Sequence, residues 1–327
     1  MSSSKPHILI TEPIPERVIS FLQEVGEVTV GEKGTYQSEE NLIKDIPDYD
    51  ALLCMLSTPV SENVLSQGKK LKVVANFAVG YDNIDVKAAQ KYNIKVANTP
   101  DVLTEACGDY AMGLLLALSR KLKEAEQYLR DGKFNGWEPL GFLGMELRGR
   151  TLGIIGMGRI GQAFARRARA FGMKIIYHNR SRIAPEIEQE LDATYFPNYK
   201  ELTAKSDVLS LNCPLTKETY HLVDEALLKL MPEHALLINI SRGAVIDEEA
   251  LANALHRNSI AGTALDVFEE EPDVHPKLLS APNTLLLPHI ASATHKTREA
   301  IGMLAAKAIT SVLKGRHDTE IPNLISP

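Results

Sequence analysis

The chain has 327 residues, more than one ordinary domain holds, which suits two domains. Hydrophobic residues make up 44% and charged residues 24%, as in globular proteins, and the formal charge of −6 argues against nucleic-acid binding. The three cysteines are widely spaced without a metal-binding pattern, so we expect buried, reduced thiols and no metal. No apolar segment has the length needed to cross a bilayer, so we expect no membrane partner and a cytoplasmic protein.

The segment 7–99 alternates short β-rich runs with amphipathic helical runs. The predicted strands are 7–11, 27–30, 50–56, 71–79 and 94–98. Such alternation predicts a parallel sheet covered by helices. The first turn of the series, TEPIPERV (11–18), has no glycine triplet, so we do not expect it to bind phosphate.

A long helix is predicted from about Thr104 into Gln127, and the glycine-rich segment 130–150 then interrupts regular structure. A last helix is predicted over 292–315. Between them lies a second series of strands, at 151–155, 174–178, 207–211, 235–240, 261–268 and 283–288. We therefore predict an α/β protein with two doubly wound parallel-sheet domains, Rossmann-like or flavodoxin-like, joined by long helices.

The clearest motif is G-x-G-x-x-G at Gly156, Gly158 and Gly161, directly after an apolar strand and before a helix. Its glycines allow a tight turn, close approach of the backbone to a pyrophosphate, and close packing of helix on strand. The helix N-terminus adds free N–H groups and partial positive charge. In this strand–turn–helix setting the motif predicts dinucleotide binding.

The position about twenty residues further on is usually acidic in NAD-binding proteins, because an acid binds the ribose hydroxyls. Here it is Asn179, followed by Arg180 and Arg182. At ~5 Å and an effective dielectric of ~20, each arginine–phosphate pair contributes about 3 kcal/mol before solvent screening. Although both arginines could simply face water, we expect NADP(H) to be preferred, with NAD(H) possible as well.

Three later segments follow or end predicted strands: ISRG (240–243), LDVFEEEP (265–272) and LPHIASAT (287–294). With the glycine turn they resemble the D-isomer-specific 2-hydroxyacid dehydrogenases, and within them the glyoxylate/hydroxypyruvate reductases. The resemblance also covers NFAVGYDNID (76–85), NTPDVLTEACGDYAMGLLLAL (98–118), GMELRGRTLGIIGMGRIG (144–161), NCPLTKETYHLV (212–223) and NISRGAVIDEEAL (239–251). It implies reduction of a small 2-keto acid to the D-2-hydroxy acid, with catalytic roles for Arg242, Glu271 and His289.

The chemistry of these side chains agrees with those roles. A planar guanidinium at Arg242 suits a carboxylate, and an imidazole at His289 can donate a proton near neutral pH. Glu271, if paired with that ring, would favour the imidazolium. The alternatives are an ordinary surface arginine and a loop histidine, and we expect the neighbouring Glu269 and Glu270 to face solvent.

The resemblance also implies further contacts. Asp266 would hold the nicotinamide carboxamide, and the backbone N–H groups of Val79 and Gly80 would receive the substrate carboxylate. Leu56 would limit the size of the substrate side chain, and Trp137 would reach a site across a dimer interface, unless it only packs. The remaining expected cofactor contacts are Thr104, Gly156, Gly158, Arg159, Ile160, Gly161, Asn179, Arg180, Ser181, Cys213, Pro214, Thr219, Ile240 and Ser241.

By the same resemblance the substrate-binding domain is discontinuous, comprising 1–98 and 291–327, and the inserted dinucleotide-binding Rossmann domain comprises 99–290. The family also implies a homodimer. Two alternatives stay open. One is a dehydrogenase for another acid, such as 2-ketogluconate, phosphoglycerate or a bulky keto acid. The other is a cofactor-sensing corepressor or scaffold on this fold.

Overall fold

The computed structural model describes residues 5–325 and divides into two compact units. Within the described residues, unit 1 comprises 5–103 and 293–325, and unit 2 comprises 104–292. These boundaries lie a few residues from the predicted ones, 98/99 and 290/291. The stretches 1–4 and 326–327, which the prediction assigns to the first domain, lie outside the described residues.

Unit 1 contains a five-stranded parallel sheet in the order β2-β1-β3-β4-β5, the order of flavodoxin-like folds. Its C-terminal helix α13 packs against β3, β4 and α1. The strands are β1 (His7–Ile10), β2 (Glu27–Val30), β3 (Ala51–Cys54), β4 (Val73–Asn76) and β5 (Lys95–Ala97). The helices are α1 (Glu16–Gln23), α2 (Glu39–Asp45), α3 (Glu62–Gln67), α4 (Val86–Lys91) and α13 (His295–Leu313), with short 3₁₀ turns η1 (Thr35–Gln37), η2 (Ile46–Asp48) and η4 (Asp318–Glu320).

Unit 2 contains a seven-stranded parallel sheet in the order β12-β11-β10-β9-β6-β7-β8. The strand order reverses beside β6, which is the Rossmann arrangement and marks the place where such sheets bind ligands. The strands are β6 (Thr151–Ile155), β7 (Lys174–His178), β8 (Ala193–Tyr195), β9 (Val208–Leu211), β10 (Leu236–Asn239), β11 (Gly262–Leu265) and β12 (Thr284–Leu286). The helices are α5 (Thr104–Ser119), α6 (Leu122–Arg130), α7 (Arg159–Ala170), α8 (Pro185–Leu191), α9 (Tyr199–Ala204), α10 (Glu225–Leu228), α11 (Glu248–His256) and α12 (Pro276–Leu279), with the 3₁₀ turn η3 (Gly243–Val245).

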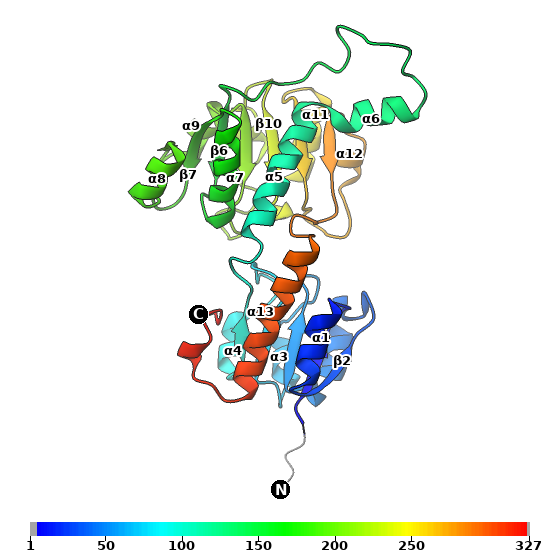
Figure 1. Ribbon diagram of the computed structural model, residues 1–327, viewed down its shortest axis with the longest axis vertical. Coiled ribbons are helices and arrows are strands. Elements are labelled where there is room, and N and C mark those ends of the chain that lie inside the picture. The colour runs from blue at the N-terminus through cyan, green and yellow to red at the C-terminus, as the bar shows by residue number, and fades with distance from the viewer. Residues whose placement is uncertain (1–4, 326–327) are drawn as a thin grey trace. The chain divides into compact units, whose positions relative to one another are not determined.

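The central strands of unit 2, β6, β9, β10 and β11, are buried on both faces, as the continuous apolar runs of the sequence require. Leu152 and Ile154 pack on the side of α5 and α7, while Ile155 packs with Leu209 and Leu211 on the other side. Figure 1 shows α5 and α7 side by side, and the two helices are in direct contact. The prediction of two doubly wound parallel-sheet domains is thereby confirmed.

One helix differs from its prediction. The run expected to be helical from Thr104 into Gln127 forms two helices, because Lys121 takes a left-handed conformation, φ 52°, between α5 and α6. A non-glycine residue with positive φ cannot continue a right-handed helix. The chain turns there, and the segment after α6 projects from the rest of unit 2 (Figure 1).

The three cysteines, Cys54, Cys107 and Cys213, are free and buried, as the sequence predicts. None of the described helices has the length and apolar character to cross a membrane.

Candidate active site

The glycine turn connects β6 to α7. Gly156 is left-handed, φ 98°, and a Cβ there would lie 2.5 Å from the backbone of Asn212. A Cβ on Gly161 would lie 2.5 Å from the carbonyl oxygen of Gly156, whereas one on Gly158 would meet nothing within 4 Å. Gly156 therefore makes the turn, and Gly161 permits close packing of the helix on the turn. Gly158 is the N-cap of α7, which has no side-chain cap, and leaves open space beside the N-terminus of this helix. An open helix N-terminus of this kind fits a dinucleotide pyrophosphate.

Asn179 follows the last residue of β7 and is tied to the glycine turn. Its Oδ1 accepts a hydrogen bond from the backbone N–H of Met157 at 2.7 Å. Arg180 next to it is exposed, but Arg182 forms two hydrogen bonds of 2.7 Å with the carboxylate of Glu188. The expected attraction of Arg182 for a phosphate is therefore weakened by this pairing, and Arg180 is the cation that remains beside Asn179.

Arg242 lies just beyond the end of β10. The Asn239 side chain accepts from the Ser241 N–H at 2.9 Å and donates to the Arg242 carbonyl at 2.8 Å, which holds the turn. The next residue, Gly243, packs directly on the backbone after β11, because a Cβ there would lie 1.8 Å from the carbonyl carbon of Phe268. Only glycine fits, and the close contact places the Arg242 turn against the loop that carries Glu271.

Glu271 and His289 form the pair that the resemblance implies. Glu271 Oε2 lies 2.9 Å from His289 Nδ1, and its Oε1 accepts from the Phe268 N–H at 3.0 Å. Burial acts to raise the pKa of Glu271, but the hydrogen bond and charge of His289, the Phe268 N–H and the charge of Arg242 outweigh it, so this pKa is lowered. Because Nδ1 is engaged by the carboxylate, proton exchange with a ligand falls to Nε2 of His289.

Asp266 is fully buried at the end of β11. Its carboxylate accepts three hydrogen bonds, from the Tyr110 hydroxyl at 2.7 Å and from the N–H groups of Ile290 at 2.9 Å and Ala291 at 2.8 Å. The residue expected to hold the nicotinamide carboxamide is therefore engaged by the loop that carries His289.

Glu269 does not face solvent, contrary to expectation. Its carboxylate lies 2.9 Å from Nε2 of His221 and accepts from the Tyr220 hydroxyl at 3.0 Å. The two rings stack, with centroids 4.0 Å apart, and the Glu269 N–H donates to Glu248 at 2.8 Å. These contacts fix the start of the Glu269–Glu271 run, while Glu270 is exposed as expected.

Two loops of unit 1, those after β3 and β4, were expected to face the substrate. The fully buried Asn76 donates to the Gly80 carbonyl at 2.6 Å and to Asn83 Oδ1 at 3.0 Å. Asn83 in turn donates to two carbonyl oxygens of the loop after β3, at 3.1 Å each. The loop with Leu56 is thereby joined to the loop with Val79 and Gly80.

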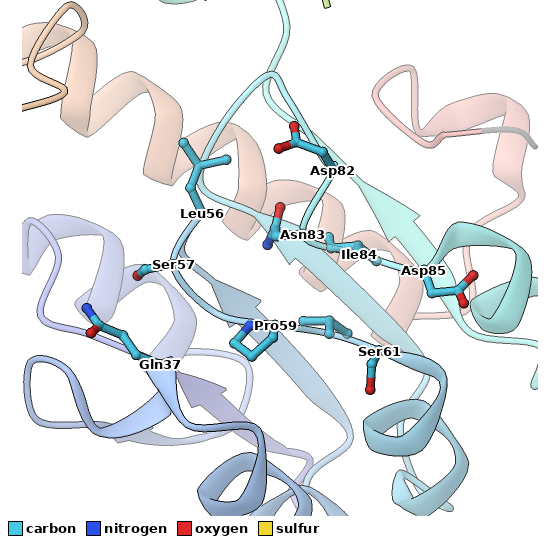
Figure 2. Close-up of a pocket in the computed structure, with 10 residues that line it drawn as sticks. Gln37, Leu56, Ser57, Pro59, Ser61, Asp82, Asn83, Ile84 and Asp85 are labelled. Atoms are coloured by element: carbon cyan, nitrogen blue, oxygen red, sulfur yellow. The ribbon is translucent and has the colours of Figure 1, made fainter. Parts of the chain in front are cut away.

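A pocket of about 520 Å³ lies between these loops in unit 1 (Figure 2). Leu56 and Ser57 line it from the first loop, and Asp82 and Asn83 from the second. The other lining residues are Gln37, Pro59, Val60, Ser61, Ile84 and Asp85.

The other expected cofactor contacts lie in loops that follow strands of unit 2 or in the first turn of a helix: Thr104, Arg159, Ile160, Ser181, Cys213, Pro214, Thr219, Ile240 and Ser241. Trp137, which was also expected to reach a site, does not lie in one of these loops or helix starts. It lies on the segment after α6 with 84% of its surface exposed. Within residues 5–325, no cluster of three or more His, Cys, Asp or Glu side chains is placed to hold a metal ion.

Comparison with known proteins decides the family. Residues 112–291 match the family described as D-isomer specific 2-hydroxyacid dehydrogenase, NAD binding domain. The chain is 49% identical to the glyoxylate reductase of Thermococcus onnurineus over 315 residues, covering 95% of this chain and 94% of the relative. This protein is a D-isomer-specific 2-hydroxyacid dehydrogenase.

Solved structures agree with that assignment. The NADPH-dependent glyoxylate/hydroxypyruvate reductase of Sinorhizobium meliloti, solved with NADP and malonate, is 40% identical, with a TM-score of 0.84 over 94% of this chain and 93% of that one. A Thermus thermophilus protein reaches a TM-score of 0.90 at 38% identity, covering 98% and 100%. The resemblance seen in the motifs is confirmed, and unit 2 is the nicotinamide dinucleotide-binding domain of this dehydrogenase.

Several residues that shape the dehydrogenase site were not predicted. Asn239 holds the Arg242 turn, Tyr110 binds Asp266, and His221 binds Glu269. Asn239 could have been found from its place directly before the ISRG motif. Tyr110 and Asp266 are 156 positions apart, and His221 and Glu269 are 48 positions apart. No local sequence pattern predicts contacts over such separations.

The close contact at Gly243 predicts that adding one methyl group at this position destabilises the protein and slows turnover. Gly243→Ala should lower the free energy of unfolding by about 1–3 kcal/mol or more, because the new Cβ meets rigid backbone. The turnover number should fall as well, because the Arg242 turn must move away from the Glu271 loop. Urea denaturation and steady-state assays would measure both effects.

Gly113→Ala on α5 is the matched control. A Cβ there meets nothing within 4 Å, so we expect unchanged turnover and a gain of about 0.5–1 kcal/mol from lost backbone freedom in the unfolded chain. Wild-type stability and turnover in Gly243→Ala would show that the two loops are not in close contact.

Proposed function

We propose that this protein reduces small 2-keto acids, with glyoxylate and hydroxypyruvate as the preferred substrates, to D-2-hydroxy acids, using NADPH in preference to NADH. One observation carries the proposal. The Arg242 turn is packed on the loop of Glu271, which pairs with His289 at 2.9 Å, all at the carboxyl ends of neighbouring strands of the dinucleotide-binding sheet. The names of the relatives support the choice of substrate.

Each catalytic side chain has one task in this proposal. Arg242 binds the substrate carboxylate through its planar fork of donors. His289 donates a proton from Nε2 to the keto oxygen, and Glu271 orients the ring and favours its charged form. The reduced nicotinamide, when bound, supplies the hydride for the keto carbon.

Two loops of unit 1 are assigned to substrate binding as well. We assign the N–H groups of Val79 and Gly80 to the substrate carboxylate, and Leu56 to the wall that limits its side chain. The hydrogen bonds of Asn76 and Asn83 support this assignment, because they hold both loops in one arrangement before substrate arrives.

A panel of 2-keto acids tests the substrate. Glyoxylate, hydroxypyruvate and 2-ketogluconate, each with NADPH and with NADH, should give the highest kcat/KM for one of the first two acids with NADPH. A higher value for 2-ketogluconate would replace the proposed substrate. Slow oxidation of the cofactor with every acid would favour a cofactor-sensing scaffold.

Removing the imidazole tests the proton donor. His289→Ala should lower kcat by about 10²–10⁴-fold, the usual contribution of a positioned general acid, while NADPH still binds with its wild-type Kd. His256→Ala is the control, since His256 is an exposed histidine of unit 2 whose Nε2 lies 3.2 Å from the Lys277 carbonyl, outside the site. Turnover near the wild-type value in His289→Ala would refute the assignment of the acid.

The cofactor preference rests on Asn179 and the exposed Arg180. Asn179→Asp combined with Arg180→Ala should shift the ratio of kcat/KM for NADPH over NADH at least about tenfold toward NADH, because it adds a repulsive charge and removes an attractive one. An aspartate oxygen can still accept from Met157, so the turn should survive. Arg182→Ala, whose partner is Glu188, should leave the ratio unchanged. An unchanged ratio in the double variant would rule out phosphate recognition here.

We further propose a homodimer formed through the segment after α5. Every residue of α6 is at least partly exposed, although Leu122 and Leu129 lie on one face of it. Trp137, Leu140 and Leu143 follow with 84%, 79% and 62% of their surface exposed. An apolar stretch of this extent is typical of a surface that another protein covers.

Two polar substitutions test the dimer. Trp137→Ser with Leu140→Ser should convert the protein to a monomer in sedimentation experiments, because the exposed apolar surface drives association. Leu279→Ser is the control, since Leu279 is 65% exposed elsewhere in unit 2. A double variant that sediments like the wild type would place the interface on another surface.

A further inference from the structure

The loop that carries His289 is held by a buried carboxylate. His289 has a left-handed backbone, φ 53°, which a side-chain-bearing residue adopts only where its surroundings hold it. The two residues after it, Ile290 and Ala291, donate their N–H groups to the two oxygens of Asp266, at 2.9 Å and 2.8 Å. Asp266 thereby fixes the backbone directly after the proposed proton donor.

Tyr110 is the third donor to this carboxylate and, among the three donors within residues 5–325, the one that lies outside the loop. Its hydroxyl donates to the Asp266 oxygen that also accepts from Ile290, at 2.7 Å. Tyr110 belongs to α5, which packs against α7, β10, β11 and β12. The hydrogen bond therefore anchors the Asp266 carboxylate to a long helix that is itself fixed in the core of unit 2.

We propose that Tyr110 is a positioning residue for catalysis, which sets the place of His289 through Asp266. The proposal rests on the proposed role of His289 as proton donor. Tyr110 need not touch substrate or cofactor; it supplies the hydrogen bond that keeps the Asp266 carboxylate aimed at the N–H groups after His289.

The electrostatics of the pair agree with this arrangement. Burial raises the pKa of Asp266, and the N–H of Ile290, the hydroxyl of Tyr110 and the N–H of Ala291 act against that rise. Without the hydroxyl, the charged carboxylate loses one of three donors and holds the loop less firmly. The pKa of Tyr110 is raised by its burial and by Asp266, so its hydroxyl keeps its proton at any working pH.

Tyr110→Phe tests the proposal with the loss of a single oxygen atom. We expect kcat to fall about tenfold, because displacing a reacting group by about 1 Å can cost about a hundredfold. The Kd for NADPH and the KM for glyoxylate should stay within about twofold of wild type, because kcat alone depends on a group that acts after binding. Tyr36→Phe is the control, since the buried Tyr36 donates to Asp45 at 2.8 Å in unit 1, in a contact of the same kind.

A double-mutant cycle with His289→Ala separates positioning from a general structural effect. If Tyr110 acts through His289, adding Tyr110→Phe to His289→Ala should leave the residual hydride-transfer rate unchanged. A further tenfold loss in that background would mean that Tyr110 acts independently of His289 and would overturn the proposal.

The remaining outcomes are equally decisive. Wild-type kcat in Tyr110→Phe, with an inactive His289→Ala, would overturn the role of Tyr110 alone. Near-normal turnover in His289→Ala would overturn the proposed proton donor, and the positioning role with it. A raised Kd for NADPH in Tyr110→Phe would assign Tyr110 to cofactor binding instead.

Discussion

The candidate site depends on one steric constraint, the contact between Gly243 and the backbone of Phe268. A side chain of any size at residue 243 would occupy the space of the Phe268 carbonyl, so the turn after β10 and the loop after β11 can meet only where a glycine stands. The contact brings the turn with Arg242 against the loop with Glu271, near enough for the Arg242 charge to help lower the pKa of Glu271. The electrostatic partnership of Arg242 and Glu271 is thus a consequence of backbone packing.

Asp266 and Glu271 lie on the same loop, but their different surroundings give the two carboxylates different roles. Asp266 is fully buried among neutral donors, and burial raises its pKa. Glu271, five positions later, is partly exposed beside His289 and Arg242, and its pKa is lowered. Glu271 is therefore charged wherever the enzyme works and can favour an imidazolium, whereas Asp266 acts as an acceptor for the backbone. The same functional group, a carboxylate, thus supplies a charge partner at one position and a structural anchor at the other.

Local patterns predicted much of this molecule, because the features concerned depend on neighbours in sequence. The spacing of Gly156, Gly158 and Gly161 and the alternating strands indicated the dinucleotide fold, and the motifs around Arg242 indicated the site. The contacts of Glu269 and Arg182 were not predictable in the same way. The Glu269 contact depends on tertiary packing, because His221 lies 48 positions away in the sequence. The Arg182 contact is local, but it depends on how the chain turns into α8, which carries Glu188, and no motif in the sequence indicates that turn.

Asn179 shows how the proposed cofactor preference could change without disturbing the fold. Its side-chain oxygen accepts from Met157 in the glycine turn, a task that an aspartate oxygen would perform equally well. The turn therefore requires an acceptor at residue 179 and is indifferent to its charge. Charge matters only to a ligand, since a carboxylate repels a phosphate that an amide tolerates. Residue 179 would thus shape the glycine turn through its acceptor and, in the proposed cofactor selection, act through its charge. Because these are separate properties of one side chain, the charge is free to vary while the turn is kept.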